Sequence, residues 1–169
     1  MQASIEKEAQ EPVHAEGTDR YRLAYDAGVH ALAQQDGTLG NLRNRATGLV
    51  TISTLIASFT GFFGVGTKDN PLPWPLAIGL IAFVLLVVGC SVYVLRPVKE
   101  WLYGPDVEDI LTSPQPSDEL LLWSQALGMK KAILENEGTL QKRSIMYSIG
   151  VSLLGLEAMY AVAVALVSR

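Results

Sequence analysis

The chain has 169 residues, a formal net charge of -4 and 49% apolar residues, a size that suits a single domain. Acidic residues outnumber basic ones by 17 to 13, so we expect no nucleic-acid-binding surface. The single cysteine, Cys90, excludes a disulfide within the chain. The two histidines, His14 and His30, belong to no metal-ligand pattern, so no metal site is expected.

The sequence contains none of the common catalytic motifs. We find no glycine-rich phosphate loop after a strand, no nucleophile elbow and no HExxH motif. The carboxylates outside the apolar stretches scatter over polar helix faces and do not converge with a base or a nucleophile. We therefore predict a protein that is not an enzyme and that needs no cofactor.

The chain begins with a polar, acidic stretch over residues 1–17, which predicts a disordered tail. Residues 18–45 contain no proline, and apolar side chains such as Tyr25 and Val29 recur at helical spacing. The same pattern continues past residue 45 into an apolar stretch. We therefore predict one long helix over about residues 19–63, whose first part, 18–45, forms a cytoplasmic stalk.

Three stretches carry almost no charge and are long enough to cross a membrane, which takes about 20 apolar residues. They are residues 46–66, 74–95 and 145–167. A soluble domain of this size could not enclose three such helices. The predicted fold class is therefore an all-α integral membrane protein with three transmembrane helices, the first and third of which extend into the cytoplasm as a helical stalk.

The basic residues predict the orientation in the membrane. Five Lys or Arg residues precede the first span and six lie in residues 96–144, whereas the loop 67–73 and the segment after residue 167 carry one each. Short loops rich in Lys and Arg stay in the cytoplasm. We therefore expect a multi-pass protein with a cytoplasmic N-terminus, an outside loop over 67–73 and an outside C-terminus.

The segment 96–144 is predicted to contain a loop and a second stalk helix. Prolines up to Pro116 indicate a loop, and Ser117, followed by two acids, predicts a helix N-cap. An apolar stripe through Leu122 and Met129 then runs into the third span. We expect this helix to pack parallel to the first stalk helix, either within one chain or as a coiled coil that joins chains.

Small and hydroxyl-bearing residues recur every three or four positions in the first and third spans, which predicts faces that pack against other helices. The alternative is a wetted pore lining. These residues are Thr47, Thr51, Thr54, Ser58, Gly61, Ser148, Ser152 and Gly155.

Glu157 lies near the middle of the third span, where an ionised carboxylate is costly. At 100° per residue it lies opposite Ser148, with Gly150 and Tyr160 on its own side. This face is predicted to line a pore or to meet a second copy of the chain. The alternative is a protonated carboxyl group bonded to a Ser, Thr or Tyr of a neighbouring helix.

These features resemble a known family. The resemblance rests on the acidic start, a helix ending in LGNLRNRATGLVTISTLIASF that enters the first span, a close second span and a third span preceded by a helix. The chain resembles the small transmembrane effectors of bacterial cyclic-nucleotide anti-phage systems, notably the Pycsar transmembrane effectors. Arg45-Ala46 matches the charged residue and alanine of that family at the mouth of the first span. The chain is also similar to the SLATT effector domains, which have two spans.

The resemblance implies a membrane-disrupting effector of abortive infection in the bacterial inner membrane. A neighbouring nucleotide cyclase would make cUMP or cCMP, and the effector would respond by impairing the membrane. A phosphate group needs cations, for which the alternative role is ordinary positive-inside anchoring. The candidate cations near the membrane are Arg43, Arg45, Lys130, Lys131, Lys142 and Arg143.

Two further functions stay open. The chain could be a membrane adaptor or anchor whose stalk recruits a partner, or a constitutive small channel. An adaptor would tolerate substitution of Glu157, whereas a constitutive channel would conduct without a ligand.

Overall fold

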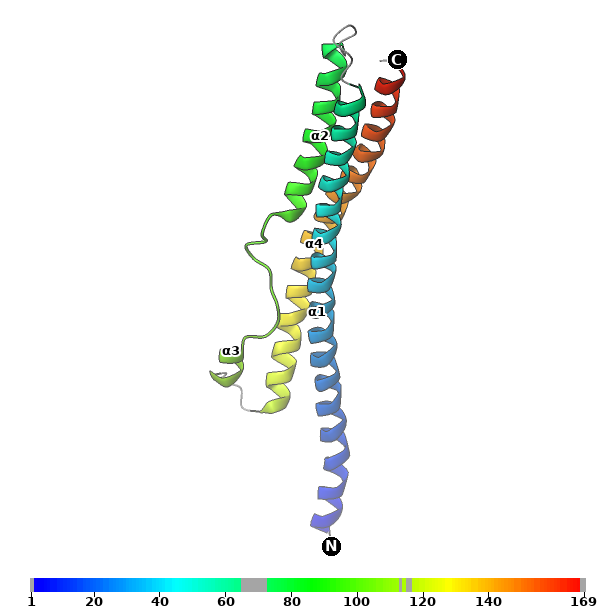
Figure 1. Cartoon of the computed structure of the whole chain (residues 1–169). Coiled ribbons are helices and arrows are strands. Elements are labelled where there is room, and N and C mark those ends of the chain that lie inside the picture. The colour runs from blue at the N-terminus through cyan, green and yellow to red at the C-terminus, as the bar shows by residue number, and fades with distance from the viewer. Residues whose placement is uncertain (1, 65–72, 113, 115–116, 168–169) are drawn as a thin grey trace. The chain divides into compact units, whose positions relative to one another are not determined.

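The computed structural model describes residues 2–64, 73–112, 114 and 117–167, with side chains described over 19–61, 73–108, 110–112, 114 and 117–166 (Figure 1). α1 spans Gln2–Gly64, α2 spans Trp74–Leu95, α3 spans Val107–Thr112 and α4 spans Asp118–Val167. These described ranges contain no β-strand. The all-α class is therefore confirmed. Most of the predicted outside loop, 67–73, lies outside the described residues.

The two long helices follow their predicted course with one difference. α1 contains the whole predicted helix over 19–63 and begins at Gln2, so the structure continues this helix through residues 2–17, for which the sequence predicts a disordered tail. Residues 2–11 are mainly strong helix formers such as Gln, Ala, Glu and Lys, which favour this extension. The predicted N-cap of α4 is confirmed, because Ser117 Oγ accepts a hydrogen bond from the Leu120 N–H at 3.3 Å.

Two helices, α2 and α4, contain stretches long and apolar enough to cross a membrane. Only 28% of the apolar window of α2 and 22% of that of α4 is buried, whereas the core helix of a soluble protein is mostly buried. The first predicted span, residues 46–66, falls in α1 as far as Gly64, and its last side chains lie outside the described part of the chain. That residues 46–66 cross the membrane therefore stays a prediction.

The chain divides into two compact units, and α1 and α4 contribute to both of them. Unit 1 comprises Met1–Thr38 and Glu100–Thr139, and unit 2 comprises Leu39–Lys99 and Leu140–Arg169. The boundary of unit 1 in α1 and in α4 falls several residues before the apolar stretches begin.

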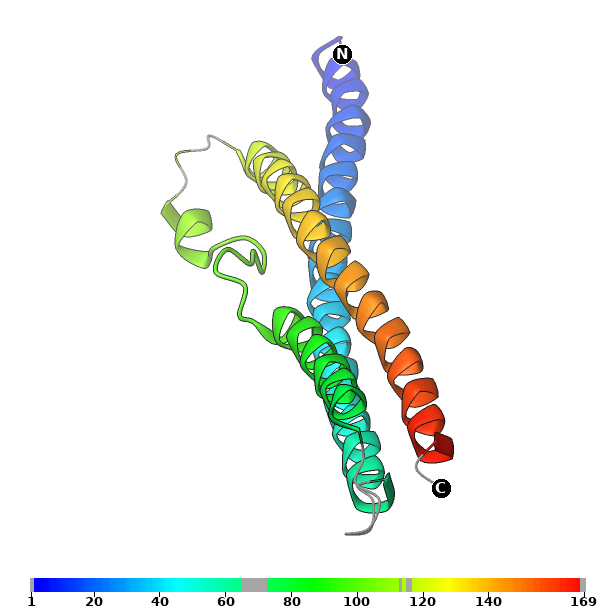
Figure 2. The same cartoon turned by 90° about the horizontal axis from the view of Figure 1, so that it is seen from above.

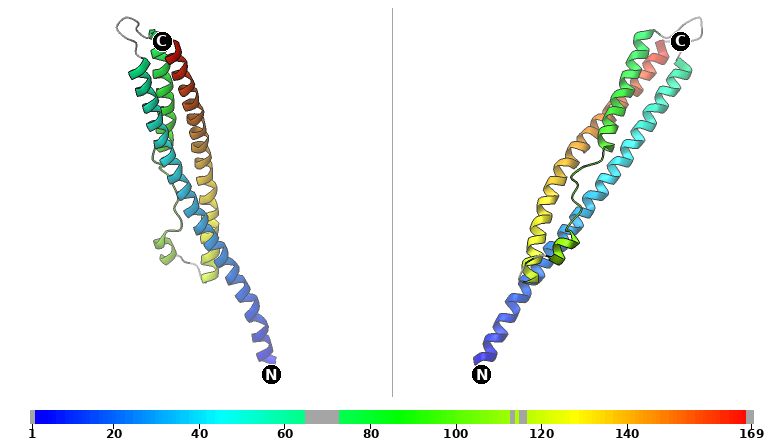
Figure 3. Two further views of the ribbon diagram at one scale, coloured as in Figure 1. Left: turned by 45° about the vertical axis from the view of Figure 1, so that its right-hand side comes forward. Right: turned by 90° about the vertical axis from the view of Figure 1, so that its left-hand side faces the viewer.

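In unit 1, α1 and α4 run parallel and side by side (Figures 1 and 3). Gly28 allows a close approach, since a Cβ atom at this position would lie 2.9 Å from Met129 Cε. Further along the same two helices, Gln35 Nε2 of α1 donates a hydrogen bond to the Ile133 carbonyl of α4 at 3.0 Å. The predicted packing of the stalk helices within one chain is thus observed. The side chains that form this core are Leu32, Met129 and Ala132, with Tyr25 and Ile133 packed against them.

Asn136 holds the segment that precedes α3 against α4 in unit 1. Its Nδ2 donates to the Leu102 carbonyl at 2.9 Å, and its Oδ1 accepts from the Leu102 N–H at 3.4 Å. In the sequence, Asn136 interrupts the apolar stripe of this helix. In the structure Asn136 is buried on the packed side. Both polar groups of its amide have backbone partners there, which offsets the cost of burying them.

We expect Asn136→Ala to destabilise unit 1 by about 1–3 kcal/mol, because Leu102 loses its partner while the site stays buried. Protease cleavage of the loop between α2 and α4, followed in detergent-solubilised protein, measures this effect as faster cutting. Gln34→Ala, at an exposed position of α1, is the matched control. Equal cleavage rates for the two variants would show that Asn136 does not hold the segment.

In unit 2, α4 contacts both α1 and α2, and Figure 2 shows α2 in front of α1 with the last part of α4 to one side. Gly150 of α4 sits where a Cβ atom would lie 3.2 Å from Leu49 Cδ1 of α1 and 3.4 Å from Cys90 Cβ of α2. Nearer the other end of α4, the Tyr160 hydroxyl donates to the Leu76 carbonyl of α2 at 3.1 Å. The face of α4 that carries Gly150 and Tyr160 is therefore the face that packs inside this unit.

Candidate functional site

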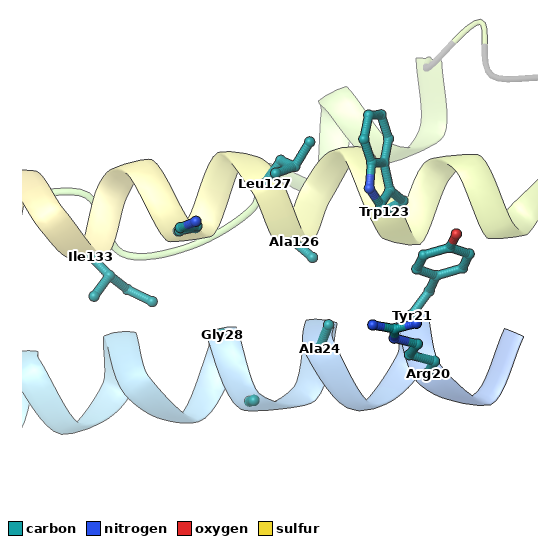
Figure 4. A pocket seen from close by; sticks show the side chains of 10 residues that line it. Arg20, Tyr21, Ala24, Gly28, Trp123, Ala126, Leu127 and Ile133 are labelled. Atoms are coloured by element: carbon teal, nitrogen blue, oxygen red, sulfur yellow. The ribbon is translucent and has the colours of Figure 1, made fainter. Parts of the chain in front are cut away.

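A groove of about 620 Å³ lies between α1 and α4 in unit 1 (Figure 4). Pockets that hold small ligands measure roughly 300–1,000 Å³. The groove is therefore large enough for a ligand of nucleotide size. Its lining residues are Arg20, Tyr21, Ala24, Ala27, Gly28, Trp123, Ala126, Leu127, Lys130 and Ile133.

Small residues open this groove. Ala24 and Gly28 of α1 lie four residues apart, which places them on one helix face, and Ala126 faces the groove from α4. The short side chains of Ala24 and Ala126 leave space between the helices there, whereas Met129 fills the place beside Gly28 and, with Leu32, forms the neighbouring core. The local change from large to small residues thus creates the groove.

Cationic and aromatic side chains supply the chemistry of the groove. Figure 4 shows Tyr21 of α1 and Trp123 of α4 at the same end of the groove, with Arg20 next to Tyr21. Lys130 lines the groove from α4, and none of the described lining residues is acidic. Guanidinium and ammonium groups bind phosphate, and aromatic rings stack on bases. The groove therefore suits a small ligand that carries both a negative charge and an aromatic ring.

Of the six cations predicted to bind phosphate, one, Lys130, lines this groove. Lys131 is exposed and forms an ion pair with Glu135 at 3.9 Å. Arg45 and Lys142 are exposed. Arg20, Tyr21 and Trp123 were not predicted as site residues from the sequence. Their only sequence signal is that Tyr21 precedes Ala24 and Gly28 on one helix face, and this signal acquires meaning only when the partner helix is known.

The remaining two predicted cations, Arg43 and Arg143, come together in unit 2. Arg143 is 7% exposed and donates a hydrogen bond to the Val94 carbonyl in the last turn of α2. Burial lowers the pKa of the Arg143 guanidinium, and the positive charge of Arg43 lowers it further. A carbonyl at a helix C-terminus lacks a partner in its own helix, so Arg143 satisfies an otherwise free acceptor. Arg143 is buried and Arg43 is half-buried, in contrast to the exposed basic residues that anchor a protein at the membrane surface.

Glu157 lies inside unit 2. Its side chain and that of Ser53 are both 0% exposed, and Ser53 Oγ donates a hydrogen bond to Glu157 Oε2 at 2.7 Å. The prediction that Glu157, Gly150 and Tyr160 form a pore-lining or intermolecular face is wrong for this chain, because all three face its interior. The alternative, a carboxyl group bonded to a serine of a neighbouring helix, agrees with the structure. The other oxygen, Oε1, is buried without a hydrogen-bond partner among the described residues.

The predicted packing faces point outward instead. Their hydroxyl groups donate to the carbonyl four residues earlier in the same helix, as Thr54 does to Val50 at 2.8 Å and Ser152 does to Ser148 at 3.1 Å. A hydroxyl group that bonds its own helix in this way can face outward. The carboxyl group of Glu157 makes no such bond within α4, and its hydrogen-bond partner is Ser53 of α1. The exposed members of the predicted faces are Thr47, Thr51, Thr54, Ser58, Ser148, Ser152 and Gly155, and Gly61 is half-buried.

No protein-family model matches the chain, and no curated protein or solved structure matches it. The family resemblance inferred from the sequence thus has no independent support from these comparisons.

Proposed function

We propose that this chain is a membrane effector of anti-phage defence that is triggered by a cyclic pyrimidine nucleotide, cUMP or cCMP, and then impairs the bacterial inner membrane. The observation that carries this proposal is the groove of unit 1. It combines Arg20 and Lys130 with Tyr21 and Trp123, and its described lining residues include no acid. A cyclic mononucleotide offers one charged phosphate for the cations and one base for stacking between the aromatic rings.

The apolar helices support a multi-pass membrane protein. α2 and α4 are long and apolar enough to cross a bilayer, and residues 46–66 of the sequence, which precede them, have the length and composition of one further span. The distribution of Lys and Arg supports a topology with the N-terminus and the groove in the cytoplasm and the C-terminus outside. The groove then faces the compartment in which a neighbouring cyclase would make the nucleotide.

The helices that line the groove also supply the buried residues of unit 2. α1 carries both Arg20 and Ser53, and α4 carries both Trp123 and Glu157. A ligand that bridges α1 and α4 in unit 1 therefore acts on the two helices that meet through the Ser53–Glu157 hydrogen bond. This continuity provides a physical route from ligand binding to a change in the membrane part.

The test uses the full-length protein in liposomes loaded with a fluorescent dye. We expect dye release in the presence of cUMP or cCMP, little release with cAMP or cGMP, and none without a nucleotide. Calorimetric titration of the detergent-solubilised protein should give the same ranking for binding. The proposal is wrong if neither pyrimidine nucleotide binds, and dye release without any nucleotide would instead support a constitutive channel.

One observation favours an adaptor as the second candidate function. Unit 1 exposes large apolar side chains on α4, namely Leu120, Leu127 and Leu134. Exposed apolar patches commonly mark protein-binding surfaces. An adaptor would capture a partner through unit 1 and would release no dye with any nucleotide.

A further inference from the structure

Arg43 and Arg143 lie at the same level of unit 2. Gly150 of α4 lies against Leu49 of α1, which is 101 positions earlier in the chain. Arg43 and Arg143 are 100 positions apart, so the same register brings them together. Arg143 also donates a hydrogen bond to the Val94 carbonyl, which places the pair beside the last turn of α2. The two guanidinium groups therefore lie where α1, α2 and α4 come closest to one boundary of their apolar stretches.

No carboxylate neutralises this pair within the described part of the chain, where neither arginine forms an ion pair. Burial and then the charge of Arg43 lower the pKa of the Arg143 guanidinium, and the group that opposes them is the phenol of Tyr93 rather than an acid. Arg43 Nε is buried without a hydrogen-bond partner among the described residues. The pair thus combines two positive charges with an unbonded N–H donor, and an anion from outside the chain would satisfy both.

The position of the pair indicates which anion this is. Arg43 and Arg143 precede the apolar stretches 46–66 and 145–167 by two or three residues, which is the level of the lipid headgroups if these stretches cross the membrane. Tyr93, in the last turn of α2, is a residue type enriched at the same level. Basic sites between membrane helices on the cytoplasmic side bind anionic headgroups.

We propose that Arg43 and Arg143 bind the phosphodiester of an anionic phospholipid in the cytoplasmic leaflet. Arg43 is half-buried, so a headgroup can reach it from the lipid side, and its planar guanidinium group suits two oxygens of a phosphate. Arg143, which is 7% exposed and held by the Val94 carbonyl, supplies a second, fixed charge. This lipid site is separate from the groove of unit 1, whose described lining includes neither arginine.

The lipid site goes beyond the proposed function, since it requires no nucleotide. It rests on one part of that function, the insertion of these helices in the membrane with the pair on the cytoplasmic side. The tests below are therefore run without nucleotide. Failure of lipid binding leaves the nucleotide trigger untouched, and failure of the nucleotide trigger leaves the lipid site untouched.

The first test is native mass spectrometry of the full-length protein in detergent with equal amounts of two lipids, the anionic phosphatidylglycerol and the zwitterionic phosphatidylcholine. We expect the folded chain to bind phosphatidylglycerol preferentially. Arg43→Gln should lower this preference by about fivefold, which is the effect of one cation near an anionic headgroup. The lipid is counted on folded protein alone, so an unstable variant does not imitate a loss of binding.

Arg96→Gln is the matched control, because it removes an exposed arginine at the end of α2. This variant should keep the preference for phosphatidylglycerol. The proposal would be overturned if the wild-type chain bound the two lipids equally, if Arg43→Gln kept the full preference, or if Arg96→Gln lost as much of it as Arg43→Gln.

The second test distinguishes a lipid from a free phosphate by thermal unfolding in detergent. A ligand that binds the folded chain raises its midpoint of unfolding. Phosphatidylglycerol should raise this midpoint more than phosphatidylcholine does, and the difference should shrink in Arg43→Gln but not in Arg96→Gln. Inorganic phosphate at the same concentration should leave the midpoint unchanged. Equal stabilisation by inorganic phosphate and by phosphatidylglycerol would contradict a lipid site.

Discussion

Trp123→Ala is expected to weaken the binding of cUMP or cCMP by about tenfold or more. Removing an aromatic side chain that stacks on a base costs roughly 1–3 kcal/mol, and 1.4 kcal/mol corresponds to a factor of ten in affinity. Trp123 is partly exposed, so this substitution should leave the fold of unit 1 intact. Calorimetry measures the affinity directly, and the nucleotide concentration for half-maximal dye release should rise in parallel.

Two control variants make this prediction specific to the groove. Trp123→Phe keeps an aromatic ring and should retain most of the affinity, whereas Leu23→Ala removes an exposed apolar side chain of α1 outside the groove and should change nothing. Arg20→Ala, which removes a phosphate partner, should weaken binding about as much as Trp123→Ala. Unchanged affinity in both Trp123→Ala and Arg20→Ala would show that the nucleotide does not bind in this groove.

The second large effect is expected at Glu157. Glu157→Lys should destabilise unit 2 by about 3 kcal/mol or more, because an ammonium group in the middle of a membrane helix has no paired charge. Glu157→Gln keeps an acceptor for the Ser53 hydroxyl and should cost about 1 kcal/mol or less. Thermal unfolding in detergent and the yield of membrane-inserted protein measure the difference.

The same pair of variants separates an interior carboxyl group from a pore-lining one. A side chain that faces a water-filled pore tolerates lysine about as well as glutamine, since both stay hydrated. The buried position of Glu157 predicts instead that lysine is much worse than glutamine. Nucleotide-triggered dye release should persist in Glu157→Gln. Equal stability of the Glu157→Lys and Glu157→Gln variants would instead support a pore lined by Glu157.

Local signals in the sequence were sufficient to predict α2, α4 and α1 from residue 19 onward, but not the short helix α3, which lies where the prolines predict a loop. Apolar residues at helical spacing and the absence of proline over residues 18–45 predict a helix that runs on into an apolar stretch, and α1 does so. Ser117 followed by acids predicts the start of α4, and its side chain caps that helix. Each of these properties depends on neighbours within a few positions along the chain. They can therefore be predicted without a tertiary structure.

The choice between two opposite faces of α4 could not be made in this way. The sequence places Glu157 opposite Ser148, but it does not say which of them faces the protein. Only the tertiary structure brings Ser53 of α1 within 2.7 Å of Glu157 and leaves Ser148 to bond its own helix. A carboxyl group needs a partner from another helix, whereas a serine hydroxyl does not.

The groove depends on tertiary structure in the same way. Arg20 and Trp123 are about a hundred positions apart, and the pairing of α1 with α4 brings them to one site. A sequence shows which residues share a face of one helix, since that depends on helical period alone. It does not show the register between two helices, which is decided by contacts such as that of Gly28 with Met129. The sequence by itself thus determined the helices and their apolar stretches, and the packing decided which side chains form the site.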